Sequence, residues 1–148
     1  MNVGDLMSTQ LITIEPEQDL GVVLALMHEF DIHSLPVVER ATGRLVGIIS
    51  ARDVRLAIDS PFSSPDDEQA ANHLESVYVG EVMSTSLVVI GPGATVGDAA
   101  RRMLSHKVNG LPVVQMDNIG NTRLIGLITT SDLLRYLADL EGDKPVEG

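Results

Sequence analysis

The 148-residue chain contains no cysteine and no tryptophan, and it has only two tyrosines and two phenylalanines. Without cysteine it can form no disulfide framework, iron–sulfur cluster, thiolate zinc site or cysteine nucleophile. Aromatic residues make up 3% of the chain, which leaves few stacking platforms for single-stranded nucleic acid. Hydrophobic residues still make up 44% of the chain, so we expect a core of aliphatic side chains and methionine.

Basic residues are also scarce: the chain has 10 Lys and Arg against 21 Asp and Glu, which gives a net charge of −11. This charge disfavours nucleic acid and anionic membrane surfaces as partners. No apolar run approaches the roughly 18 residues of a membrane-spanning helix. The opening residues Met1–Asp5 lack the basic and apolar regions of a signal peptide. We therefore expect a soluble cytoplasmic protein with no nucleic-acid or membrane partner.

An internal repeat organises the chain. Val-Gly-Asp-Leu-Met-Ser-Thr at residues 3–9 recurs as Val-Gly-Glu-Val-Met-Ser-Thr at residues 79–85, an offset of 76 residues. At this offset 14 of the 37 positions in residues 3–39 are identical, where about two or three would be expected by chance. A second shared motif, residues 47–53 and 126–132, is offset by 79 residues. The chain therefore contains a duplication, and the second copy has three additional residues before this motif.

Each copy predicts the order strand, helix, strand, strand, helix, which places the fold in the α/β (α+β) class. Short first strands are expected at residues 11–14 and 87–90. The following helices begin at Asp19 and at Thr95, and Thr95 and Asp98 have capping-box spacing. Apolar residues at helical spacing predict one buried face on each helix, formed by Leu20, Val23, Leu24 and Met27 and by Val96, Ala99, Ala100 and Met103.

The domain organisation follows from the duplication. We predict a first repeat at residues 1–59, an acidic linker at 60–76, a second repeat at 77–140 and a flexible tail at 141–148. The later strands of the first copy are expected at 35–38 and 45–49, and the last helices at 50–58 and 129–140. A repeat of about 60 residues rarely holds a robust core alone. We therefore expect the two repeats to pack together as a pseudo-two-fold pair.

A hydroxyl and a carboxylate recur where an apolar strand runs into a helix, as Ser50 with Asp53 and Thr129 with Asp132. One interpretation is a helix cap, because the spacing is that of a capping box. The other is a ligand site, because free amides at a helix start bind phosphate and a carboxylate can accept two hydrogen bonds from a ribose diol. The local chemistry leaves both open, although a cap does not require Asp at the same place twice.

Three motifs occur in the same order in both copies: Val-Gly-Asp/Glu-Leu/Val-Met-Ser-Thr, Leu-Pro-Val-Val and Gly-apolar-Ile-Ser/Thr-x-x-Asp. In this combination the chain resembles the cystathionine β-synthase-type (CBS) domain, whose tandem pair is called a Bateman module. The resemblance covers residues 3–58 and 79–140. It implies tandem CBS repeats, each β-α-β-β-α, in a non-catalytic regulatory module that binds adenosine-containing ligands in clefts between the repeats.

The resemblance also implies roles for individual residues. Asp53 and Asp132 would hold ribose, and Ser50 and Thr129 would line the site near ribose and phosphate. Arg52 and Ser131, the residues before the two aspartates, would reach phosphate. His33 of the first copy would also contact phosphate. Apolar walls of the adenine pocket would come from Ile48, Val37, Leu127 and Val113. Because the copies differ at their phosphate-facing positions, we expect unequal sites, with the one at Arg52 and His33 preferring more phosphate.

The function implied by the resemblance is that of a stand-alone energy sensor that binds AMP, ADP or ATP, needs no cofactor and signals to a partner or through its homodimer. S-adenosylmethionine or NAD remains open as the ligand, and a structural dimerisation adaptor with vestigial sites remains the alternative. An enzyme is disfavoured because no base, nucleophile or metal cage is evident. His28 and His33 lack a third metal ligand, and the glycines of residues 91–97 depart from dinucleotide-fingerprint spacing.

Overall fold

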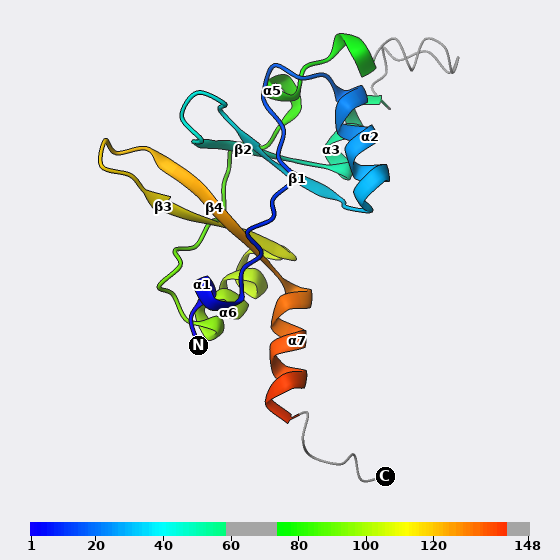
Figure 1. Ribbon diagram of the computed structural model, residues 1–148. Coiled ribbons are helices and arrows are strands. Elements are labelled where there is room, and N and C mark those ends of the chain that lie inside the picture. The colour runs from blue at the N-terminus through cyan, green and yellow to red at the C-terminus, as the bar shows by residue number, and fades with distance from the viewer. Residues whose placement is uncertain (59–73, 142–148) are drawn as a thin grey trace, which may run out of the picture. The chain divides into compact units, whose positions relative to one another are not determined.

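The computed structural model describes residues 1–58 and 74–141. Most of the predicted linker and nearly all of the predicted tail therefore lie outside the described residues. The chain divides into two compact units, unit 1 of residues 1–11 and 88–148 and unit 2 of residues 12–87, coloured along the chain in Figure 1. Each is described below by itself.

The two units have corresponding elements, and both have the predicted mixed α+β composition. Each contains a short helix, a longer helix, an antiparallel strand pair and a last helix. Unit 2 is built from α2 (Leu20–Phe30), β1 (Ser34–Val38), β2 (Leu45–Ser50), α3 (Ala51–Ile58) and α5 (Val79–Val82). Unit 1 is built from α1 (Val3–Leu6), α6 (Val96–His106), β3 (Gly110–Met116), β4 (Thr122–Thr129) and α7 (Thr130–Glu141).

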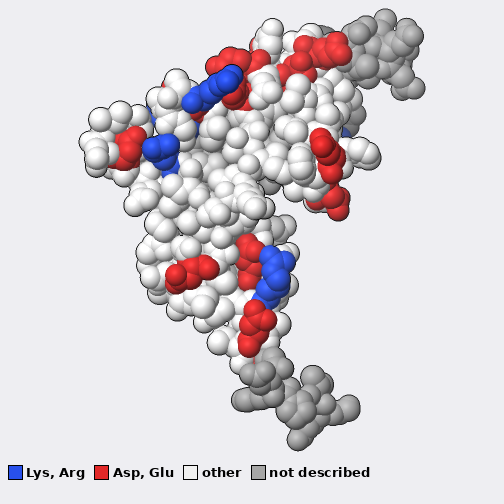
Figure 2. Space-filling view, in the orientation of Figure 1, with Lys and Arg blue, Asp and Glu red and all other residues white. Residues whose placement is uncertain are grey.

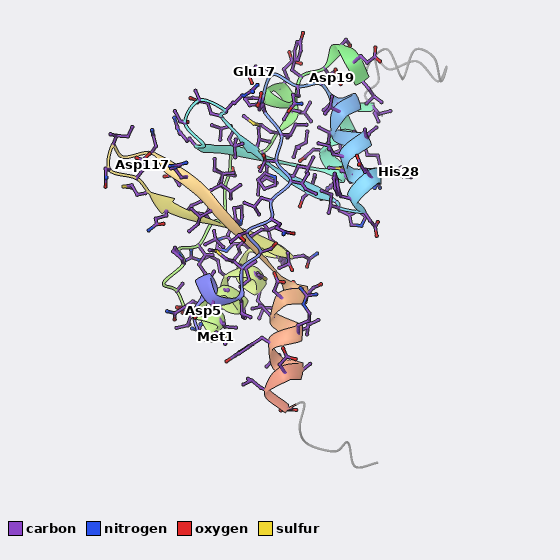
Figure 3. The ribbon with its side chains drawn as sticks, viewed as in Figure 1. Met1, Asp5, Glu17, Asp19, His28 and Asp117 are labelled. Carbon is purple, nitrogen blue, oxygen red and sulfur yellow. The ribbon has the colours of Figure 1, made fainter. Side chains whose placement is uncertain are left out.

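The long helices begin where the sequence predicts. Asp19, labelled in Figure 3 at the start of α2, accepts a hydrogen bond from the Val22 amide at 3.1 Å. Thr95 and Asp98 form the predicted capping box at α6, with reciprocal bonds of 3.1 and 3.0 Å. The predicted apolar faces are confirmed, because each is buried or partly buried against its own core.

The short first strands at 11–14 and 87–90 are a wrong prediction, because each is reduced to a single bridging residue. Ile14 pairs in parallel with Val37, and Ile90 pairs in the same way with Val113. Prolines explain this limit. Extending the ladder on either side of Ile14 requires an N–H at position 16 or 36, and both residues are proline, which has no N–H to donate. Prolines stand at the matching positions 92 and 112 of the second copy.

The opening motif of each sequence repeat lies in the unit built mainly from the other repeat. The amides of Val79 and Gly80 donate to carbonyls of residues 18 and 16, at 2.8 and 2.9 Å. Val3 and Gly4 do the same to carbonyls of residues 94 and 92. Val3 and Val79 are fully buried in the cores of units 1 and 2. The compact units therefore differ from the sequence repeats by an exchange of opening segments.

The described end of the predicted linker is ordered in unit 2. Residues 74–76 are helical, and Leu74 packs against the hydrophobic core of that unit. The Leu20 amide donates to the carbonyl of Val77 at 3.1 Å. The chain that leads into α5 is thus tied to the start of α2.

Candidate functional site

The candidate site of unit 2 lies where β2 runs into α3. Ser50 ends β2 opposite Ser34 of β1, and the His33 carbonyl accepts a hydrogen bond from the Ala51 amide at 2.8 Å. Ser50 and Asp53 bond reciprocally, because the Ser50 amide donates to Asp53 Oδ2 at 2.9 Å and the Asp53 amide donates to Ser50 Oγ at 3.1 Å. The helix-cap interpretation is therefore confirmed for this pair.

The cap leaves several polar groups at this junction without a hydrogen-bond partner among the described residues. Asp53 accepts through Oδ2, and no group of the described residues donates to its Oδ1. The Arg52 and His33 side chains are exposed and form no ion pair within residues 1–58 and 74–141. Ser50, Arg52 and Asp53 thus lie at the start of α3, and the His33 backbone is joined to the same turn.

The corresponding junction of unit 1 has the same cap but a differently held carboxylate. The Thr129 amide and hydroxyl both donate to Asp132 Oδ2, at 2.8 and 3.1 Å. Asp132 Oδ1 accepts a hydrogen bond from Arg135 Nη2 at 2.5 Å. The Thr130 amide donates to the Asn109 carbonyl at 2.9 Å, and the Ser131 side chain is exposed. Sequence reasoning missed Arg135, although its spacing of three residues from an aspartate is typical of a helical ion pair.

The structure separates the four apolar residues predicted for the adenine pocket. Ile48 and Leu127 are half-buried, and Ile48 lies two residues before Ser50 on the same face of β2. Val37 pairs with Gly47 and Val113 pairs with Gly126, so these two valines lie on the opposite, core-facing side. Both are fully buried. Val37 and Val113 thus lie on the other side of their strand pairs from Ile48 and Leu127, and the adenine-pocket role of these four residues stays a prediction.

The opening motif of each copy forms an antiparallel bridge with β2 or β4. Ile48 and Ser84 exchange backbone hydrogen bonds of 3.0 and 2.8 Å, and Leu127 and Ser8 exchange bonds of 3.0 and 2.9 Å. A Cβ built on Gly47 would lie 2.6 Å from Sδ of Met83 and 2.9 Å from the Ser84 carbonyl oxygen. Glycine is therefore required there by the close approach of the motif to β2.

Other features of the described residues lie away from these junctions. A cavity of about 210 Å³ lies at the end of the β3–β4 hairpin, and another of about 490 Å³ lies beside α5; Figure 3 labels Asp117 and Glu17, which line them. Within residues 1–58 and 74–141 no three acidic or histidine side chains are grouped to hold a metal ion. The same residues include no helix long and apolar enough to cross a membrane.

Residues 3–60 and 79–139 match the CBS domain. The chain belongs to the CBS domain family. It is 42% identical over 135 residues to a CBS domain-containing protein of Dictyostelium discoideum, covering 91% of this chain and 90% of the relative. This relative is itself named only for its CBS domains, so it supports the family and no particular ligand.

Solved structures support the tandem CBS fold. The AcuB protein of Vibrio cholerae is 30% identical, with a TM-score of 0.78 and coverage of 98% of both chains. CBSX2, a CBS-pair protein of Arabidopsis thaliana, is known in complex with AMP. That complex is 28% identical to this chain, with a TM-score of 0.73 and coverage of 95% of this chain and 98% of the other. The predicted family and tandem CBS fold are therefore confirmed.

Proposed function

We propose that this CBS pair is a regulatory module that binds an adenosine nucleotide, with one site at the Ser50–Asp53 junction and one at the Thr129–Asp132 junction. In each, the aspartate accepts hydrogen bonds from the ribose diol. The neighbouring hydroxyl lines the site near ribose and phosphate, and the positive end of the helix favours the phosphate. The recurrence of this hydroxyl–carboxylate pair at the same junction in both units carries the proposal. The AMP complex of CBSX2 supports this ligand class.

The unit 2 site has the stronger chemistry for phosphate. Arg52 and His33 are exposed beside the positive end of α3, and the counterpart of Arg52 is the neutral Ser131. A guanidinium can bind a phosphate through two parallel hydrogen bonds. We therefore expect Arg52→Ala to weaken ATP binding more than AMP binding. Equal effects on the two nucleotides would contradict a phosphate role for Arg52.

The ligand class is tested by thermal unfolding with AMP, ADP, ATP, S-adenosylmethionine and NAD. A ligand that binds only the folded state at 100 times its Kd stabilises by about 2.7 kcal/mol. We expect stabilisation by at least one adenine nucleotide, and we expect the Asp53→Asn/Asp132→Asn variant to lose it. Asp98→Asn is the matched control, because Asp98 forms the same capping box at α6 away from both junctions.

Output through a homodimer is the second part of the proposal. The side chains of Leu134, Leu137 and Leu140 on α7 are between 57% and 62% exposed, and Leu104 on α6 of the same unit is 79% exposed. The three α7 leucines are spaced three residues apart, which places neighbouring ones close together on the helix surface, and exposed apolar patches mark interaction sites. We expect the chain to sediment as a dimer and Leu137→Glu to shift it toward the monomer. A wild-type monomer at micromolar concentration would contradict this part and leave an unidentified partner protein as the receiver.

The alternative is a structural adaptor whose nucleotide sites do not function. It predicts a folded, dimeric protein that none of the five ligands stabilises. The same thermal measurement therefore separates the two functions.

A further inference from the structure

The two proposed ribose carboxylates differ in one ion pair. Arg135 lies three residues after Asp132 on α7, and its Nη2 donates to Asp132 Oδ1 at 2.5 Å. The corresponding residue after Asp53 is Leu56, whose side chain is 61% exposed. Oδ1 of Asp53 consequently has no donor among the described residues, whereas both oxygens of Asp132 are occupied.

We propose that Arg135 is a specificity-determining residue that competes with the ribose diol for Asp132 and thereby weakens the unit 1 site. The inference rests on the proposed adenosine function and names the residue that makes its two sites unequal. Adenosine then fills the Asp53 site first and the Asp132 site at higher concentration. Arg135 acts on the sugar, whereas Arg52 and His33 act on the phosphate, so the two effects are separable with adenosine itself.

The burial of the pair explains why the competition is effective yet reversible. Only 12% of the Asp132 side chain is exposed, against 70% of the Arg135 side chain. The carboxylate is therefore held in place, while the guanidinium can swing into solvent. Figure 2 shows basic atoms beside acidic ones along α7.

The size of the effect follows from the exposure of the arginine. Exposed ion pairs contribute about 0.2–1 kcal/mol. A ligand that must displace such a pair loses about the same amount, which corresponds to a Kd raised by up to about five-fold. Because the diol bonds to the carboxylate, the loss applies only to nucleosides that carry both hydroxyls.

The test measures adenosine binding by calorimetry in variants that retain one site. In the Asp53→Asn background, Arg135→Leu is expected to tighten adenosine binding by about two- to five-fold and to leave 2′,3′-dideoxyadenosine binding unchanged. In the Asp132→Asn background, Leu56→Arg installs the missing arginine and is expected to weaken adenosine binding by a similar factor. Leu56 and Arg135 are both exposed, so neither substitution disturbs a core.

Arg101→Leu is the matched control. Arg101 pairs with Asp98 at the same spacing, with 2.7 Å between Nη2 and Oδ1, and it also follows a capping box in unit 1. Its replacement is expected to leave adenosine binding unchanged.

The results distinguish a failure of the Arg135 competition from a failure of the proposed adenosine binding. Unchanged or weaker adenosine binding with Arg135→Leu, in a background that still binds adenosine, would overturn the competition while leaving the proposed function in place. An equal gain for the dideoxynucleoside, or for Arg101→Leu, would also overturn it. Absence of adenosine binding in the wild type and in both backgrounds would overturn the proposed function together with this inference.

Discussion

Gly47→Ala is expected to destabilise unit 2 because Met83 and Ser84, in the opening motif of the second copy, pack directly against Gly47 of β2. The new Cβ would lie 2.6 Å from Sδ of Met83 and 2.9 Å from the carbonyl oxygen of Ser84. The sulfur can rotate away, but the carbonyl cannot, because Ser84 is tied to Ile48 by two backbone hydrogen bonds. The strand pair and the motif must therefore move apart.

The magnitude follows from two opposing terms. Overpacking in a closely packed region costs about 1–3 kcal/mol, and replacing a strand glycine by alanine returns about 0.5–1 kcal/mol of backbone entropy. We expect a net loss of about 1–2 kcal/mol in the free energy of unfolding. For a chain of this length that is a fall in Tm of about 2–8 °C. Urea titration and thermal unfolding followed by circular dichroism measure both quantities.

Gly126→Ala is the matched control in unit 1. The three atoms nearest to its Cβ all belong to the Met7 side chain, which can rotate, so the loss should be smaller than at Gly47. In the Gly47→Ala background, Met83→Ala should recover only part of the stability, because the Ser84 carbonyl remains. A Gly47→Ala protein as stable as wild type, or less affected than Gly126→Ala, would refute this reasoning.

Three further predictions concern the cores and the cap of α6. Val79→Ala should lower the free energy of unfolding by about 1–3 kcal/mol in urea titrations, because Val79 is fully buried in unit 2. Val82→Ala should lower it less, because Val82 is only half-buried. Equal losses would contradict the packing of this opening motif into unit 2. Thr95→Ala should cost about 1 kcal/mol in the same assay through the lost cap, and an unchanged midpoint would contradict it. The Thr95 amide, and then the Arg101 guanidinium, lower the pKa of Asp98 below its ordinary value. The stability that this carboxylate contributes is present above its unfolded pKa and is lost as pH falls through its lower folded pKa. The stability difference between wild type and Asp98→Asn should therefore shrink below about pH 4, and a difference independent of pH would contradict the assignment.

Much of the fold follows from local sequence signals. The duplication, the helix starts at Asp19 and Thr95 and the apolar helix faces are all confirmed, because capping and helical periodicity act within a few residues. The first strands are shorter than predicted because extending each ladder needs an N–H at position 16 or 36, or at 92 or 112, and all four residues are proline. The exchange of the opening motifs was not predictable from the repeat alone, since five of the seven motif residues are the same in both copies.

The candidate site was predictable at its polar residues and less so at its apolar ones. Ser50 with Asp53 and Thr129 with Asp132 lie at strand-to-helix junctions, as the motif indicates. The pairing of Val37 with Gly47 places Val37 on the core-facing side, opposite Ile48, and this register comes from the structure and not from alternation within either strand. The Arg135 pair was accessible from spacing, but only the structure places its guanidinium on the carboxylate that the ligand would need.

We propose that two strand-to-helix junctions bind adenosine nucleotides through Asp53 and Asp132. Calorimetric titration of AMP into wild type, Asp53→Asn, Asp132→Asn and the double variant tests it most directly. The account predicts up to two sites per chain in wild type, loss of the tighter site with Asp53→Asn, loss of the weaker one with Asp132→Asn, and no binding to a folded double variant. AMP binding that survives unchanged in the double variant, or no binding to wild type at millimolar AMP, would contradict it.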